Sequence, residues 1–110
     1  MRLAAIDPGT TESAIVLWDG ERVLRAEICP NAELLCALRC ETWAYLLAIE
    51  QVESYGMAVG REVFETCYWS GRFREAHEAR GCGRMVQMTP RRTVKLHLCN
   101  SMRAKDGNIR

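Results

Sequence analysis

The sequence predicts an α/β fold, in which a mixed five-stranded sheet follows the order β-β-β-α-β-α-β-α and carries helices on both faces. Three short β-prone segments separated by turn residues come first, and amphipathic helical patterns then alternate with short apolar strands. Three antiparallel strands followed by crossover units indicate a mixed sheet. The chain has 110 residues, which is the size of one domain.

The first three strands are expected at residues 3–7, 13–18 and 21–28. A Pro8-Gly9 turn joins the first two strands. Asp19-Gly20 joins the next two, and this dipeptide is a strong hairpin signal because both residues tolerate positive φ. The first half of the sheet is therefore predicted to be an antiparallel meander.

The second half alternates helices and strands. Pro30 and Asn31 are expected to end the third strand, with Asn31 as the N-cap of the first helix. Pro90 is expected to open the last helix at its first turn. The expected ranges are a helix from 32 to about 45, a strand at 46–52, a helix from 61 to about 80, a strand at 85–88 and a helix from 91 to 99.

Two carboxylates stand in β-prone apolar runs. Asp7 ends the run LAAID, and Glu50 lies in LLAIEQV. A parallel crossover through the intervening helix would place the two side by side, where they would repel each other unless a cation neutralised them. Mg²⁺, or Mn²⁺ in its place, prefers oxygen ligands and keeps waters for substrate phosphates, so we expect Asp7 and Glu50 to hold metal. The alternatives are a turn-forming Asp-Pro-Gly for Asp7 and a solvent-facing edge position for Glu50.

Charge is divided unevenly along the chain. Residues 1–71 carry five arginines against eleven acids, whereas residues 72–110 carry ten basic residues against three acids. A polyanion would be attracted to the second half, so the asymmetry points to nucleic acid, with a solvated basic face as the alternative.

The six cysteines show no C-x-x-C spacing, and reduced core thiols are favoured over metal ligation. Cys36, Cys40 and Cys67 lie in helical patterns where they are expected to pack as small hydrophobes. Large aromatic residues are expected in the core as well. These are Trp18, Trp43, Phe64 and Trp69.

No apolar run approaches the roughly 20 residues needed to cross a bilayer, and the N-terminus lacks the pattern of a signal peptide. We therefore expect a soluble cytoplasmic protein without a membrane partner.

The motifs IDPG, AIEQV, RRTVK and RAKD, in this order, resemble the RuvC Holliday-junction resolvases of the ribonuclease H-like superfamily, the phage-type members in particular. The resemblance extends over essentially the whole chain. It implies a single RNase H-like domain over residues 1–110 and a metal-dependent endonuclease that binds branched DNA as a homodimer and nicks it symmetrically.

The resemblance also implies roles for individual residues. Asp7 and Glu50 match the metal ligands of the first and fourth strands, and Lys95 and Lys105 match the basic residues near the scissile phosphate. Further contacts to DNA are expected from the backbone-binding Arg91, Arg92 and Arg103 and from Tyr55, which would stack on an unpaired base.

One departure from the family pattern affects the expected activity. RuvC-like enzymes complete the metal site with acids on a C-terminal helix beyond the second lysine, and this sequence ends at Arg110 with Asp106 as its only late acid. We therefore expect reduced or absent cleavage from these residues. A non-catalytic DNA-binding remnant is one alternative. Another is an ATP-phosphate-binding domain, because IDPGTT also resembles the first phosphate loop of the actin and sugar-kinase superfamily.

Overall fold

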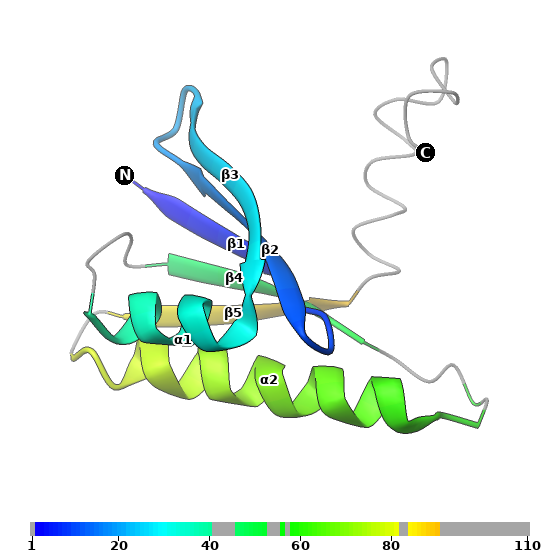
Figure 1. Ribbon diagram of the computed structural model, residues 1–110. Coiled ribbons are helices and arrows are strands. Elements are labelled where there is room, and N and C mark those ends of the chain that lie inside the picture. The colour runs from blue at the N-terminus through cyan, green and yellow to red at the C-terminus, as the bar shows by residue number, and fades with distance from the viewer. Residues whose placement is uncertain (1, 41–45, 53–55, 57, 82–83, 91–110) are drawn as a thin grey trace, which may run out of the picture.

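A five-stranded sheet packs on two helices in the computed structural model, which describes residues 2–40, 46–52, 56, 58–81 and 84–90 (Figure 1). The elements are β1 (Leu3–Asp7), β2 (Glu12–Trp18), β3 (Val23–Pro30), α1 (Asn31–Cys40), β4 (Leu46–Gln51), α2 (Arg61–Glu78) and β5 (Met85–Pro90). The strand order in the sheet is β3-β2-β1-β4-β5.

The sheet is mixed, as predicted. β1 pairs antiparallel with β2, and β2 pairs antiparallel with β3, so these three strands form the expected meander. β4 joins β1 in parallel, and β5 joins β4 in parallel. The carboxyl ends of β1, β4 and β5 therefore lie at one edge of the sheet, where ligands of open α/β sheets commonly bind.

The core lies between the sheet and the helices. Alternate strand residues such as Ile6, Ile15 and Ile49 are buried on one face, as the period of two in a strand requires. Leu34 of α1 and Phe73 of α2 pack into the same core cluster, so both described helices cover this face (Figure 1). The expected covering of the other face depends on the helix predicted at 91–99, which lies outside the described residues.

Two predictions at the ends of elements are wrong. Asn31 is the first residue of α1, but its buried side chain bonds to Ser13 and to Gly9 and does not cap the helix. Pro90 is the last residue of β5, so it belongs to the sheet and is not itself a residue of a helix. An edge strand tolerates proline because its outer N–H needs no ladder partner, and the sheet therefore continues two residues further than the sequence pattern indicates.

The turn between β2 and β3 contains the predicted Asp19-Gly20 pair but is longer than two residues. Gly20 has φ of 107°, and the Asp19 carboxylate accepts hydrogen bonds from the backbone N–H groups of Glu21 and Arg22, each at 2.9 Å. These bonds hold the pKa of Asp19 below its usual value, because they favour the ionised carboxylate. The third strand consequently begins at Val23 and not at residue 21.

The prediction of buried helical cysteines is also wrong. Cys36, Cys40 and Cys67 are exposed thiols. Cys36 and Cys40 lie beside the buried stripe of α1, which contains Leu34, Leu35 and Leu38. Cys67 is not among the buried residues of α2. Among the described cysteines, Cys29 of β3 is the half-buried one, and its burial raises the pKa of its thiol.

Of the aromatic residues predicted in the core, Trp69 is half-buried and packs against the core cluster, whereas Trp18 and Phe64 are exposed. Trp43 lies outside the described residues. Within the part of the chain that the structure describes, no helix is both long and apolar enough to span a membrane.

Candidate active site

Asp7 and Glu50 stand side by side on neighbouring strands. β1 and β4 run in parallel with Ile6 opposite Ile49, so the residues that follow, Asp7 and Glu50, occupy the next level of the same pair. Neighbouring strands lie about 4.8 Å apart, which brings the two side chains within reach of one ion. The structure thus has the juxtaposition that the sequence predicts.

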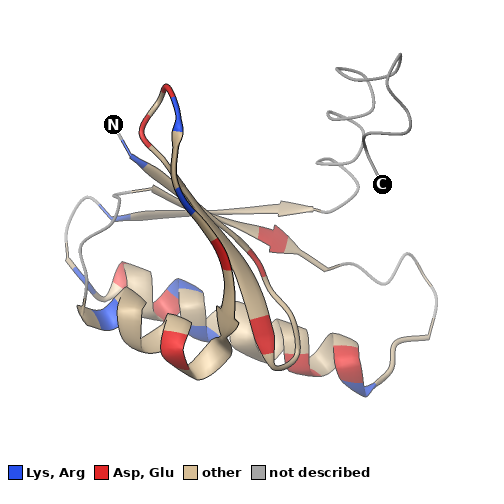
Figure 2. Ribbon diagram, turned by 45° about the horizontal axis from the view of Figure 1, so that its top comes forward, with Lys and Arg blue, Asp and Glu red and all other residues tan. Residues whose placement is uncertain are grey.

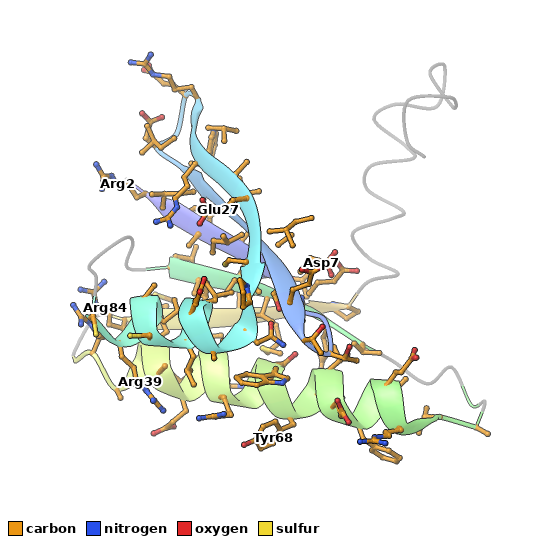
Figure 3. All side chains as sticks on the ribbon, in the orientation of Figure 1. Arg2, Asp7, Glu27, Arg39, Tyr68 and Arg84 are labelled. Carbon is orange, nitrogen blue, oxygen red and sulfur yellow. The ribbon has the colours of Figure 1, made fainter. Side chains whose placement is uncertain are left out.

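Both carboxylates belong to the sheet face that points away from α1 and α2. Ile6 and Ile49 are buried on the helical face, so the residues that follow them face the opposite side. Asp7 is labelled in Figure 3, beyond the sheet from the two helices. Asp7 and Glu50 line a pocket of about 240 Å³ on this face, together with residues of β2 and β5.

Thr89 is a third polar residue of this pocket, and the sequence analysis missed it. It stands opposite Glu50 in the parallel pair of β4 and β5, one strand further from Asp7. The sequence pattern ended the fifth strand at Met88, which left Thr89 in a loop. Its hydroxyl adds an oxygen ligand or a hydrogen-bond donor to the row formed by Asp7 and Glu50.

A buried hydrogen-bond network fixes the turn that follows Asp7. Ser13 Oγ donates to Asn31 Oδ1 at 2.5 Å and accepts from the Gly9 N–H at 3.1 Å, while Asn31 Nδ2 donates to the Gly9 carbonyl at 3.0 Å. The Asn31 N–H donates to the Thr11 carbonyl at 2.9 Å. The first residue of α1 therefore holds the turn that ends β1, and with it the backbone that carries Asp7.

Gly9 is required by the close approach of the backbone within this turn. A Cβ at Gly9 would overlap the carbonyl oxygen of Glu12, and backbone atoms cannot move aside cheaply. The Pro8-Gly9 turn therefore has a steric reason for its glycine. Because the Gly9 N–H already bonds to Ser13, the turn is a poor match for a loop that cradles ATP phosphates through its amides.

The residues of the pocket fit a hard divalent cation. Two carboxylates on adjacent strands repel each other unless positive charge lies between them, and Mg²⁺ is commonly bound by one or two carboxylates together with waters and substrate phosphates. Asp7 is exposed and Glu50 is half-buried, so an ion there would keep open positions for water and substrate. Among the described residues, no group of three or more His, Cys, Asp and Glu side chains gathers around one point, so the fit rests on the two acids.

The other predicted site residues lie outside the described residues. They are Tyr55, Arg91, Arg92, Lys95, Arg103 and Lys105. Six of the ten basic residues of 72–110 belong to the segment 91–110, so the predicted basic surface is described only in part. Its described members include Arg72, which stacks on Tyr68 and Trp69, and Arg74, which pairs with Glu78. Figure 2 shows acidic and basic positions interspersed along the two helices.

Comparison with known proteins gives matches at the level of structure. No protein-family model and no curated protein sequence matches this chain. The structure of T. thermophilus RuvC in complex with a Holliday junction substrate matches with a TM-score of 0.66 and 20% identity, over 92% of this chain and 73% of the RuvC chain. A second Thermus thermophilus RuvC structure matches with a TM-score of 0.56 and 19% identity, over 82% of this chain and 64% of that chain.

The chain therefore has a RuvC-like fold, with a mixed five-stranded sheet of the ribonuclease H-like type. The resemblance found in the sequence motifs and the similarity of the structures agree on this fold.

Proposed function

We propose that this chain is a divalent-metal-dependent endonuclease that binds branched DNA and hydrolyses its phosphodiester bonds. The observation that supports the proposal most directly is the position of Asp7 and Glu50, adjacent on one sheet face at the carboxyl ends of parallel strands. Its fold is that of RuvC, and RuvC itself has been observed with a Holliday junction. A four-way junction is therefore the substrate of choice for a test.

In the proposed site, Asp7 and Glu50 hold Mg²⁺ or Mn²⁺ through their carboxylate oxygens, and Thr89 supplies a hydroxyl beside Glu50. Bound metal would supply an activated water and neutralise charge on the scissile phosphate. The network of Gly9, Ser13 and Asn31 keeps the Asp7 backbone in place, so that the carboxylate is positioned before substrate arrives.

In this proposal, the positively charged side chains that contact DNA come from the segment that follows β5. Lys95 and Lys105 would neutralise the phosphate beside the metal, while Arg91, Arg92 and Arg103 would bind the DNA backbone without reading its sequence. Tyr55 would stack on an unpaired base. Two copies of the chain would act on the two symmetric strands of a junction, so a homodimer belongs to the proposal. These roles come from the residue types and from the resemblance to RuvC.

The test is cleavage of a labelled four-way junction in Mg²⁺ or Mn²⁺ by the wild type, Asp7→Asn and Glu50→Gln. Each substitution keeps the shape of the side chain and removes its charge. We expect the wild type to nick the junction slowly, because only two acids among the described residues hold the metal. Each variant should lose about a further 100-fold or more in rate, because metal catalysis lowers the barrier by several kcal/mol.

The control is Glu62→Gln, which removes an exposed acid in the first turn of α2 and is expected to nick at the wild-type rate. Equal activity in all four proteins would reject Asp7 and Glu50 as the site. Junction binding in EDTA without nicking in either metal would select a non-catalytic DNA-binding protein instead.

A further inference from the structure

Cys36 and Cys40 bring two thiols together on the surface of α1. They are four residues apart in the helix, so their side chains lie on the same face, one turn after the other. Their sulfur atoms are 3.9 Å apart, and both residues are exposed. A solute can therefore reach both sulfurs at once from solvent.

A disulfide between these two cysteines does not fit an intact helix. Helical residues four apart have Cβ atoms about 5–6 Å from each other, whereas a disulfide needs Cβ atoms about 3.5–4.5 Å apart. The bond would therefore require the last turn of α1 to unwind. As long as α1 keeps its helical form up to Cys40, the pair remains a dithiol.

The distance between the two sulfurs matches the requirements of a tetrahedral metal ion. Two Zn–S bonds of about 2.3 Å at the tetrahedral angle place their sulfur atoms about 3.8 Å apart. The sulfurs of Cys36 and Cys40 already have nearly this separation, at 3.9 Å. Both can therefore bind one ion without any change in the backbone of the helix.

The chemistry of the two ligands selects the type of ion. Thiolate sulfur is a soft ligand that prefers Zn²⁺ and related ions, whereas Mg²⁺ and Ca²⁺ prefer oxygen. Two thiolates also balance the charge of a divalent cation. Among the described residues no group of three or more metal-binding side chains is present, so water or another small ligand would complete the coordination.

We propose that Cys36 and Cys40 form a two-thiolate site for a thiophilic divalent cation of the Zn²⁺ and Cd²⁺ type. The site does not depend on the proposed function, because α1 covers the sheet face opposite to the one that carries Asp7 and Glu50 (Figures 1 and 3). The two sites also select different ions, since one offers carboxylate oxygen and the other offers sulfur.

A bound ion would tie together the last two turns of α1. The final carbonyl groups of a helix have no partner within it, and such ends fray easily. One of these groups, the carbonyl of Arg39, accepts a hydrogen bond from the guanidinium of Arg80. The ion adds a second connection at this end of the helix, so amide hydrogen exchange in residues 36–40 should become slower when it binds.

The test is a titration of the reduced protein with Cd²⁺ in the absence of other thiols and of oxygen, followed by ultraviolet absorption and calorimetry. Bonds between Cd²⁺ and thiolate give a charge-transfer band, so absorption reports ligation by sulfur. Binding should release about two protons per ion and should become tighter as the pH rises, because both thiols must lose their protons. Cys36→Ser and Cys40→Ser should each raise the dissociation constant about tenfold or more, because one thiolate remains.

Two further variants make the test specific to the spacing of the pair. Cys67→Ser removes an exposed thiol of α2 and should bind Cd²⁺ as the wild type does. Gly71→Cys, made in the double variant Cys36→Ser and Cys40→Ser, creates a new pair with Cys67 at the same spacing of four residues. Gly71 has open space around an added Cβ, so this variant should recover the lost binding. Circular dichroism should show the wild-type helix content in every variant.

Unchanged Cd²⁺ affinity in both Cys36→Ser and Cys40→Ser would overturn the inference, because the ion would then be held elsewhere in the chain. A wild type that binds no Cd²⁺ would do the same. If the Gly71→Cys variant failed to recover binding, spacing alone would not make the site, which contradicts the geometric argument. A protein that binds Cd²⁺ as expected but does not nick DNA would reject the proposed function alone.

Discussion

Asn31 links the first turn of α1 to the residues that follow Asp7. Its side chain is 1% exposed and uses its oxygen for Ser13 and its nitrogen for Gly9. Ser13 and Asn31 are buried, and an unpaired polar group is costly there. The backbone position of Asp7, a candidate metal ligand, therefore depends on hydrogen bonds between uncharged groups at the other end of the turn that follows it.

At the residue scale, Ser13→Ala should lower the free energy of unfolding by about 1–3 kcal/mol, because it leaves Asn31 Oδ1 without its donor and the Gly9 N–H without its acceptor. Urea denaturation measures this difference. The matched control is Ser70→Ala, which removes a buried hydroxyl that donates to the Thr66 carbonyl within α2. That carbonyl keeps its place in the helix, so the control should cost less than about 1 kcal/mol. Equal losses in the two variants would contradict the role of the network.

Sequence reasoning could predict Asp7 and Glu50 because each interrupts an apolar run at the end of a strand, and an acid in that setting needs a chemical reason. It could not find the contact of Ser13 with Asn31, since the two are 18 residues apart and neither type is unusual where it stands. Thr89 was missed because Pro90 was interpreted as the start of a helix.

At the scale of elements, α2 covers the sheet with a narrow stripe. Thr66, Ser70, Phe73, Ala76 and His77 are its buried residues, spaced at three, four and one along the helix. Only Phe73 among them is large and apolar, and it is fully buried against the core cluster. The packing of α2 under the candidate active site therefore depends strongly on one side chain.

Phe73→Ala should destabilise the protein by about 3–5 kcal/mol, since it removes a buried aromatic ring and leaves a cavity. Phe64→Ala on the same helix is the control, because Phe64 is 64% exposed and its loss should change the free energy of unfolding by less than about 0.5 kcal/mol in the monomer. Thermal unfolding of both variants measures the effects. If Phe64→Ala were the more costly change, the assignment of the buried stripe would be wrong.

Element types and order follow from hydrophobic periodicity and turn residues, which is why the seven described elements appear where the sequence predicts them to within a few residues. Exposure around a helix is harder to predict. Cys36 and Cys40 lie among apolar neighbours in the sequence, yet the sheet accepts only the stripe of Leu34, Leu35 and Leu38. Which side of a mixed pattern is buried is decided by tertiary packing and not by the pattern itself.

At the scale of the whole molecule, the parallel pairing of β1 with β4 is the feature on which the site depends. It joins residues 43 positions apart in the sequence and is possible because α1 crosses over on the buried face of the sheet. The two helices leave the opposite face of the sheet, with Asp7 and Glu50, outside the core that they cover (Figure 1). The fold thus separates the face that stabilises the molecule from the face proposed to act on DNA.

The central claim is that Asp7 and Glu50 share a divalent cation, and a Mn²⁺ titration followed by electron paramagnetic resonance tests it most directly, without DNA or cleavage. The wild type should bind Mn²⁺, and Asp7→Asn and Glu50→Gln should each weaken that binding about tenfold or more, because each removes one of two charged ligands. Glu62→Gln should bind as the wild type does. Unchanged Mn²⁺ affinity in both site variants would contradict the account.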